Sequence, residues 1–335
     1  MWKLFFLICC TVLILNGCAL EEKKNKNSLE NTTNTNSFSI QNYASNRQEH
    51  TYFYKSHPQR IVALWQNSVE TLIALGAGDK IIAAGGIANE KYLKPEHLQA
   101  FQKIPLKSRQ VFSQEDVLLM KPDFILGWLF DFTGKARSIG TTDFWEKRSV
   151  NIYMNLMNGA EFKTKHVLED EIKYIHDVGK IVDREKKAEE IVAGIQRVIQ
   201  ECKTEVNKKQ NTPRVLIIAG LGKNISIYTP RTLPGDIIEK LGGETLGKNK
   251  EAIGENEFMS LEEVRLSEPD VVFISTVPEL FAVSKQRFSE LPGFKSMSCV
   301  KNGKVFCIPY YTIRSPGVRV SDAVKIFSDG LRQDG

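Results

Sequence analysis

Short apolar runs alternate with amphipathic segments along most of the chain. The run "RIVALW" (60–65) precedes "SVETLIALGAG", whose apolar residues recur at helical spacing, and "KIIAAGG" supplies a second apolar run. The same order returns in "EDVLLMK", "PDFILGW", a helical segment near 141–148 and "VNIYMN". Apolar runs joined by helices are typical of parallel sheets, because parallel strands need crossover connections and are buried on both faces. Residues 51–165 are therefore predicted to form an N-terminal α/β lobe.

A second series of the same kind begins at "PRVLIIAGLG" (213–222). It continues through the helical segments "LPGDIIEKLGGETL" and "SLEEVRLSE" to the apolar runs "PDVVFIST" and "GKVFCIPYY". Residues 211–335 are therefore predicted to form a C-terminal α/β lobe. The predicted fold class is α/β, with two Rossmann-like lobes that contain parallel sheets and are joined by one long rigid helix.

The segment 166–210 between the lobes supplies this helix. It contains no proline, has amphipathic spacing and is interrupted near Gly179 and Asp183. The part from about 184 to 208 is predicted to be a helix roughly 37 Å long, at about 1.5 Å per residue. A rigid helix beside both lobes predicts a shallow closing motion rather than a wide hinge.

The N-terminus has the pattern of an export signal. Residues 1–17 contain one early lysine followed by an apolar stretch too short for a stable membrane anchor. "LNGC" resembles the bacterial lipobox, with Asn16 as an unusual occupant, so Cys18 is the predicted lipidation site; an ordinary signal peptide with an incidental cysteine is the alternative. Residues 18–50 are polar and are predicted to be the lipidated N-terminus and a flexible tether. The protein would then be extracytoplasmic and lipid-anchored to the cell membrane.

Composition excludes several classes of protein. A net charge of +5 is too small to favour nucleic-acid binding. After removal of the signal, Cys18, Cys202, Cys299 and Cys307 form neither a dense disulfide framework nor a zinc-binding pattern. Cys299 and Cys307 flank "VKNGKVF", which has a hairpin signal at Asn-Gly. A three-residue loop would place them opposite each other and a two-residue turn would not, so a disulfide is left open.

One unit occurs twice in the sequence. "SQEDVLLMKPDFILGW" (113–128) and "SLEEVRLSEPDVVFIS" (260–275) align without a gap. Each begins with a serine N-cap and an acid three residues later, which predicts a capping box. Glu115 and Glu262 are not needed for this box, although an acid in the first turn also stabilises a helix. Because these helix ends lie at the carboxyl ends of the parallel strands, the two acids are expected beside the cleft, one on each lobe. They suit a twofold-symmetric partner with a basic residue in each half.

Four segments together resemble the substrate-binding proteins of ABC importers for iron complexes and cobalamin. They are "RIVALWQNSVETLIALGAGDKIIAAGG", "FSQEDVLLMKPDFILGW", the segment with "EKKAEEIV" and "LPGFKSMSCVKNGKVFCIP", in the order of that family and within residues 57–330. The resemblance implies that Glu115 and Glu262 dock onto arginines of a dimeric permease, which works with its ATPase. It also implies a monomeric binding protein without a resident cofactor, whose cargo is a small-molecule iron chelate held between the lobes.

The cleft is expected to be lined by residues just after the carboxyl ends of the strands. Aromatic rings beside a few arginines suit a flat, anionic ligand such as a ferric siderophore, because rings stack and guanidinium groups pair with carboxylate or catecholate oxygens. The candidate residues are Trp65, Gln66, Trp128, Phe130, Tyr153, Met154 and Asn155 in the first lobe, and Tyr228, Arg231, Tyr310, Tyr311 and Arg314 in the second.

Other ligands and other classes of protein fit the residues less well. A bare metal site would need several histidines in the cleft, whereas the five histidines fall outside the predicted strand ends, and His166 and His176 are expected to be solvated helix residues. Heme would need an axial ligand, for which only Tyr153, Met154, Tyr310 and Tyr311 are candidates. "GLG" and "GAG" lack the remaining residues of phosphate-binding loops, and no catalytic triad stands out, so an enzyme is disfavoured. Heme or cobalamin binding, and a surface heme scavenger without a permease, remain alternatives.

Overall fold

The first lobe is built on a five-stranded sheet with the order β5-β4-β3-β6-β7. The computed structural model describes residues 37–155, 165–208, 211–247 and 257–332. All neighbouring strands of this sheet pair in parallel, as the apolar runs predict. The strands are β3 (Ile61–Leu64), β4 (Ile81–Gly85), β5 (Leu106–Lys107), β6 (Phe124–Trp128) and β7 (Asn151–Asn155). The helices between them are α1 (Trp65–Ala74), α2 (Pro95–Gln102), α3 (Gln114–Met120) and α4 (Thr142–Glu146).

The second lobe has a six-stranded sheet, which is mixed rather than parallel throughout. Its path is β11-β9-β8-β12-β13, and β10 pairs in parallel with β8. Strands β9 and β11 are antiparallel to their neighbours because the short connection from β8 to β9 cannot contain a crossover helix. The strands are β8 (Arg214–Leu221), β9 (Ile225–Tyr228), β10 (Glu244–Thr245), β11 (Glu257–Met259), β12 (Val271–Thr276) and β13 (Val305–Pro309). The helices are α7 (Leu233–Leu241), α8 (Leu261–Leu266), α9 (Phe281–Ser289), α10 (Ser298–Lys301) and α11 (Val320–Arg332).

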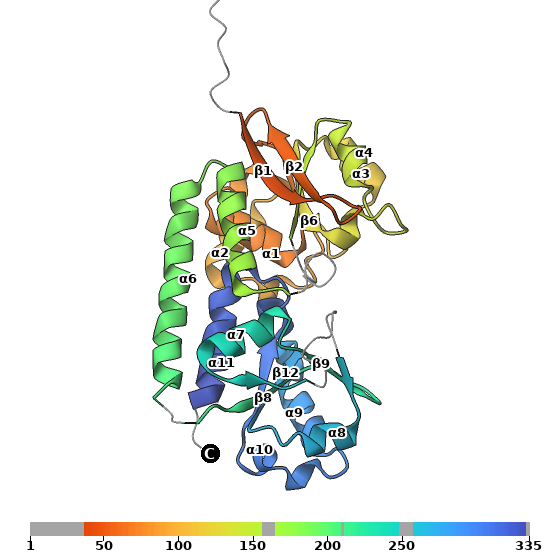
Figure 1. The fold of residues 1–335 in the computed structure, drawn as a ribbon. Helices are drawn as coiled ribbons and strands as arrows, with labels where there is room; N and C mark the ends of the chain where they lie inside the picture. The colour runs from red at the N-terminus through yellow and green to blue at the C-terminus, as the bar shows by residue number, and fades with distance from the viewer. Residues whose placement is uncertain (1–36, 156–164, 209–210, 248–256, 333–335) are drawn as a thin grey trace, which may run out of the picture. The chain divides into compact units, whose positions relative to one another are not determined.

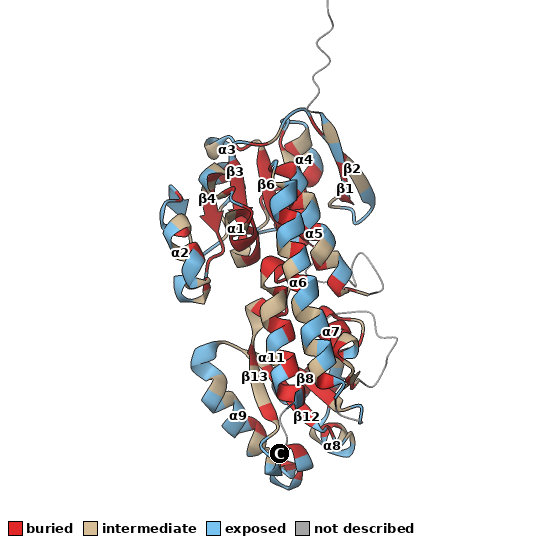
Figure 2. Cartoon of the chain, turned by 90° about the vertical axis from the view of Figure 1, so that its left-hand side faces the viewer, coloured by how far each residue is buried: buried red, intermediate tan, exposed pale blue. Residues whose placement is uncertain are grey.

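Two helices connect the lobes, where the sequence predicts them. Helix α5 (Leu168–Ile181) packs against α6 (Glu185–Val206), and α6 runs along one side of both lobes and packs against α11 (Figure 1). The two helices approach closely because Gly179 has no side chain; a Cβ there would lie 2.4 Å from the Cβ of Ala188. Figure 2 shows that the outer face of α6 is exposed, whereas the strands beneath it are buried. The α/β fold with two lobes and a long joining helix is thus confirmed.

The prediction of a flexible tether over residues 18–50 is wrong for the last part of that segment. The segments Phe38–Tyr43 (β1) and Glu49–Tyr54 (β2) form an antiparallel hairpin on the first lobe, so the folded domain begins before residue 51. The polar composition of this region conceals an alternating pattern in which Ile40 and Asn42 face the core. Asn42 exchanges hydrogen bonds with the backbone N–H and C=O of Met154, at 2.9 and 3.1 Å, and so takes the place of a strand beside β7. Residues 1–36, including the predicted signal and Cys18, lie outside the described residues.

The predicted hairpin around Asn302 and Gly303 is also wrong. Residues 298–301 form the short helix α10, and the Asn-Gly pair ends this helix rather than turning between two strands. Strand β13 then pairs in parallel with β12. Cys299 and Cys307 are consequently free thiols: Cys299 is the buried residue of α10, and the sulfur of Cys307 lies 3.4 Å from the carbonyl oxygen of Phe281.

Candidate ligand-binding site

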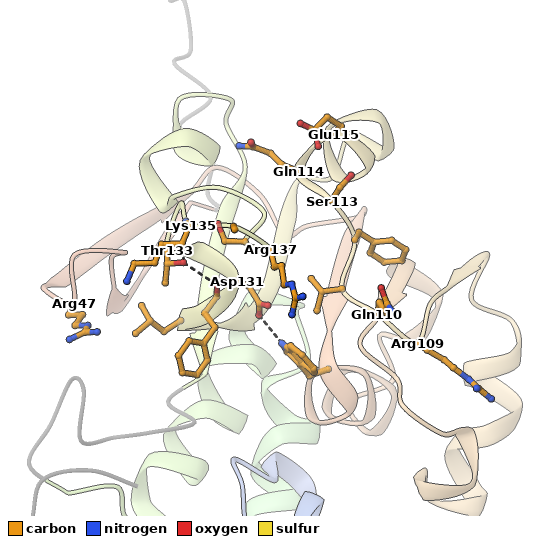
Figure 3. Close-up of a pocket in the computed structure, with 17 residues that line it drawn as sticks. Arg47, Arg109, Gln110, Ser113, Gln114, Glu115, Asp131, Thr133, Lys135 and Arg137 are labelled. Carbon is orange, nitrogen blue, oxygen red and sulfur yellow. Dashed lines mark hydrogen bonds between the residues drawn. The ribbon is translucent and has the colours of Figure 1, made fainter.

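A large hollow lies on the first lobe at the carboxyl ends of its strands. Its volume is about 1120 Å³, just above the range of about 300–1,000 Å³ that is typical of small-molecule sites. The segments 109–115 and 129–138 form most of its wall, and Arg47 and Trp65 complete it (Figure 3). The first segment follows β5 and leads into α3, and the second follows β6. The hollow is therefore at the end of the sheet where α/β proteins of this type bind ligands.

Four cationic side chains line the hollow and are spread around it from side to side (Figure 3). They are Arg47, Arg109, Lys135 and Arg137, and all four are exposed. The side chains of Arg109, Lys135 and Arg137 have no hydrogen bond or ion pair to another residue that the structure describes. Their charge is thus available to an anionic ligand in the hollow.

Trp65 lies on the wall of the hollow and is packed against Trp128 and Gly86. Its ring stacks on Trp128 with centroids 4.5 Å apart and an angle of 7° between the planes. Gly86 also lies close to this ring, since a Cβ there would be 2.8 Å from the indole of Trp65. Gly86 has φ +77°, a backbone conformation that glycine adopts without strain. Trp128 and Gly86 therefore hold the ring of Trp65 in place at the wall of the hollow.

Asp131 holds the two tryptophans in place from the floor of the hollow. The same carboxylate oxygen accepts a hydrogen bond from the indole N–H of Trp65 at 2.8 Å and one from the backbone N–H of Trp128 at 2.7 Å. Burial raises the pKa of Asp131 to about 6, although these two hydrogen bonds act to lower it. A pKa of about 6 places the loss of this negative charge on the acid side of neutral pH.

The predicted ligand residues of the first lobe separate into two groups. Trp65 and Phe130 line the hollow, Phe130 with 49 % of its surface exposed, and Trp128 stacks behind Trp65. The remaining four do not line it. The side-chain amide of Gln66 donates to Glu70 and to the carbonyl of Tyr92. Tyr153, Met154 and Asn155 are buried around a separate cavity of about 240 Å³ beside α5.

Tyr153 occupies this other position because strand side chains alternate and β7 is at the sheet edge next to α5. Its hydroxyl donates to the carboxylate of Asp177 at 2.8 Å, and its ring packs against Tyr174. The predicted role of Tyr153 in the cleft thus conflicts with its position, since its polar atom is already used inside the lobe.

The predicted residues of the second lobe gather near the junction with the first. The ring of Tyr311 stacks on Tyr92 of the first lobe at 5.2 Å, and Tyr310 packs edge-on against Tyr311 at 5.6 Å. Burial raises the pKa of both Tyr310 and Tyr311. Tyr228 is buried, and Arg231 and Arg314 are half-buried. None of these five residues lines the hollow of the first lobe.

An ion network that the sequence does not predict connects the lobes at the 3-10 turn η8 (Gly317–Arg319), which precedes α11. The fully buried Glu70 of α1 lies 3.4 Å from the guanidinium of Arg319, which also donates to the carbonyl of Tyr92 at 2.6 Å and to Asp322 at 2.8 Å. A second fully buried acid, Glu171 of α5, accepts from the backbone N–H of Gly317 at 2.6 Å. The buried carboxylates of Glu70 and Glu171 thus hold η8 in place.

Each of these buried acids is paired with a histidine. His97 lies 3.2 Å from Glu70, and His166 lies 3.0 Å from Glu171. The expectation that His166 is solvated is therefore wrong, because it is 4 % exposed; His176 is exposed as expected. In the parts of the chain that the structure describes, no group of three or more His, Cys, Asp or Glu residues could hold a metal ion.

The two predicted docking acids occupy equivalent positions on α3 and α8. Both helices begin with the predicted capping boxes, Ser113 with Asp116 and Ser260 with Glu263. Glu115 and Glu262 are both exposed, and α3 and α8 lie on the side away from α6 (Figure 1). A hydrogen bond from Arg265 lowers the pKa of Glu262. Glu115 also stands at the edge of the hollow (Figure 3).

Sequence reasoning missed the four cations of the hollow, for a different local reason in each case. Arg47 lies in the turn of the β1–β2 hairpin, within the segment assigned to the tether. Arg109 follows β5, whose two exposed residues give no apolar signal for a strand. Lys135 and Arg137 lie several residues beyond the end of β6, after the turn Leu129–Phe132. The rule of searching strand ends would have found Arg109 only if β5 had been recognised.

The comparisons with known proteins agree on one family. A family model described as periplasmic binding protein matches residues 61–312. The crystal structure of a periplasmic binding protein from Veillonella parvula DSM 2008 has 31 % identity and a TM-score of 0.78, covering 88 % of this chain and 91 % of that chain. The crystal structure of the petrobactin-binding protein YclQ of Bacillus subtilis has 19 % identity and a TM-score of 0.66, covering 89 % of this chain and 99 % of that one, and supports the fold alone.

Curated relatives from Bacillus subtilis (strain 168) include proteins named for iron. The chain is 29 % identical over 164 residues to the Fe(3+)-citrate-binding protein YfmC, covering 48 % of this chain and 50 % of the relative. It is 23 % identical over 342 residues to the petrobactin-binding protein YclQ, covering 99 % of each. The chain thus spans about half the length of the first of these relatives and nearly all of the second.

No helix among residues 37–155, 165–208, 211–247 and 257–332 has the length and apolar character needed to cross a bilayer. The family match covers most of both lobes. The matched family is one of binding proteins rather than enzymes. With its two α/β lobes, its long joining helix and its match over residues 61–312, the chain belongs to the periplasmic binding protein family.

Proposed function

We propose that the protein is the substrate-binding lipoprotein of an ABC importer and captures an iron complex, specifically a ferric siderophore. The observation that carries this proposal is the hollow of the first lobe, in which Arg109, Lys135 and Arg137 have no partner among the described residues and lie beside aromatic side chains. Siderophores bind iron through carboxylate, catecholate or hydroxamate oxygens, and guanidinium groups pair well with such anionic oxygens. The names of relatives that bind ferric citrate and petrobactin support the same class of ligand.

The aromatic groups of the site would contact the apolar parts of the chelate. Phe130 offers an exposed ring, and Trp65 lines the hollow. The indole N–H of Trp128, buried behind Trp65, has no acceptor among the described residues. From the second lobe we propose Tyr228, Arg231, Tyr310, Tyr311 and Arg314 as the wall that approaches the ligand when the lobes close.

Heme or cobalamin in the same cleft is the alternative ligand. Of the candidate axial ligands for heme, Tyr153 and Met154 are buried beside α5, which leaves Tyr310 and Tyr311. Because burial raises the pKa of both tyrosines, the phenolate form that binds ferric iron is disfavoured there. A ferric siderophore needs no protein ligand on the metal and fits the cationic hollow better.

Delivery completes the proposed function. We propose lipidation at Cys18 and an extracytoplasmic location at the outer face of the cytoplasmic membrane or in the periplasm. From there the monomeric protein passes its cargo to a permease dimer that works with an ATPase. Glu115 and Glu262 would contact arginines on the two halves of that permease, one from each lobe.

Titration of intrinsic tryptophan fluorescence tests the proposed ligand. Ferric petrobactin, ferric citrate, heme, cobalamin and the iron-free chelators are added separately to the purified protein. We expect quenching by a ferric siderophore at micromolar concentration or below, because Trp65 is at the wall of the hollow, and weaker quenching by the iron-free form. Binding of heme or cobalamin alone would favour the alternative ligands, and quenching by none of the compounds would contradict the proposed function.

Charge reversal at the two docking acids tests the proposed delivery. Cells in which Glu115→Arg and Glu262→Arg replace the wild-type protein are expected to take up the radiolabelled iron complex at least about 10-fold more slowly, because like charges would meet at both contacts. The control is Glu189→Arg with Glu201→Arg, which changes net charge equally on exposed positions of α6. Ligand affinity is measured for both proteins, since Glu115 borders the hollow. Wild-type uptake by the docking variant would support a scavenger without a permease.

A further inference from the structure

The duplicated unit places an exposed leucine at the same position in both copies. Leu119 of α3 and Leu266 of α8 are 81 % and 68 % exposed, and they occupy equivalent positions in the aligned segments 113–128 and 260–275. Single exposed apolar residues are common on protein surfaces. Here, however, the two lobes repeat the same exposure at the same position of the same short helix.

The core does not explain these leucines. Each helix packs on its lobe through one valine, Val117 in α3 and Val264 in α8, and both valines are fully buried. Leu119 and Leu266 lie two positions further along, on the opposite side of the helix from the core. Each helix therefore exposes a large apolar side chain that its own lobe does not bury.

Each leucine is on the same helix face as a proposed docking acid. Leu119 follows Glu115 by four residues, and Leu266 follows Glu262 by four residues. Side chains at this spacing are neighbours on a helix, with Cβ atoms about 5–6 Å apart. Among the described residues, Glu262 pairs with the exposed Arg265, and a surface pair of this kind contributes little. Both lobes thus present one acid beside one apolar side chain.

We infer that Leu119 and Leu266 form the apolar half of a two-point docking surface for the permease. The inference rests on the proposed function and adds the chemistry of the partner. Each half of that twofold-symmetric membrane protein would present a basic side chain next to an apolar pocket, the first for the acid and the second for the leucine. The charges attract and orient the partner, whereas burial of the leucines slows dissociation.

The double variant Leu119→Ala, Leu266→Ala tests the inference in the full-length protein. Burial of a leucine contributes enough that each substitution should weaken association with the permease by roughly 10-fold. We expect the concentration of liganded protein that half-maximally stimulates the permease ATPase in reconstituted vesicles to rise by about 100-fold for the double variant. Ligand affinity and thermal unfolding should match the wild type, because neither leucine is in the core or in the hollow.

The matched control is Val283→Ala, which removes a 58 % exposed apolar side chain from α9, outside the duplicated unit. A leucine variant that stimulates the ATPase as well as this control does would overturn the inference. If the Glu115→Arg, Glu262→Arg protein fails to stimulate in the same assay, docking itself stands and only the role of the leucines is lost. The proposed function fails on a different measurement, the absence of ligand binding by the wild-type protein.

Discussion

Replacing Arg319 by alanine is expected to lower the free energy of unfolding by about 3 to 5 kcal/mol, the effect of leaving a buried charge without its partner. Glu70 is fully buried, and only 12 % of the side chain of Arg319 is exposed. The same guanidinium also donates to the carbonyl of Tyr92 and to Asp322, so the substitution leaves several polar groups unsatisfied. Chemical denaturation at neutral pH measures the change.

The matched control for this prediction is Arg332→Ala in α11, the helix that follows η8. Arg332 pairs with Asp329 on the surface, and such pairs contribute about 0–1 kcal/mol. A change of less than about 1 kcal/mol for Arg319→Ala would show that the network does not hold the lobes together. Replacing both Glu70 and Arg319 by methionine should cost less than the single change, because apolar residues of similar volume leave no buried charge.

The same network predicts a dependence on acid. Burial acts to raise the pKa of Glu70, but the hydrogen bond from His97 and the charge of Arg319 outweigh it, so the pKa lies below its ordinary value of 4.5. A carboxyl with a lowered pKa stabilises the fold above its unfolded pKa, and the contribution is lost as pH falls through the folded pKa. The wild type should therefore lose stability below pH 4.5, and Arg319→Ala should lose less over that range because part of the contribution is already absent.

Neutralising the three cations of the hollow is expected to weaken ligand binding by about 1,000-fold. A hydrogen bond to a charged group contributes about 1.5–3 kcal/mol, so each change to glutamine should cost about 10-fold or more. The variant is Arg109→Gln, Lys135→Gln, Arg137→Gln, and fluorescence titration with the compound that quenches the wild type most strongly gives the dissociation constant. Thermal unfolding should be unchanged, because all three side chains are exposed and have no partner among the described residues.

Two comparisons make this result specific. Lys301→Gln removes an exposed cation from α10 in the second lobe and should leave the dissociation constant unchanged. Raising the salt concentration should weaken binding by the wild type more than binding by the triple variant, because salt screens the charges that the variant lacks. Equal affinity of the triple variant and the wild type would place the ligand away from this hollow.

Much of the architecture could be read from the order of apolar and polar residues. The runs that become β3, β6, β8 and β12 are continuous and buried on both faces, and the serine–acid pairs that begin α3 and α8 are local signals. Such features depend on neighbours in the sequence, so no tertiary contact is needed to recognise them. Strand β5 and the hairpin β1–β2 were missed, because their stability comes from pairing with the rest of the lobe rather than from their own composition.

The site could be predicted only in part. Trp65 and Phe130 follow strands of clear apolar character and line the hollow, but the cations Arg109, Lys135 and Arg137 lie on loops whose courses the sequence does not specify. Tyr153 also follows the rule of strand ends, yet its hydroxyl is bound to Asp177 of α5. The alternation of side chains along a strand determines which residues share a face of the sheet. The helix packed beside that strand determines which of the two faces can contact a ligand.

By itself the sequence determined the two lobes, the helix between them and the repeated acids Glu115 and Glu262, because periodicity and capping are local properties of the chain. Only the tertiary structure decided that a buried Glu70–Arg319 pair joins the lobes and that Leu119 and Leu266 stay exposed beside those acids. Burial depends on segments far apart in the chain coming together, and no local pattern contains that information.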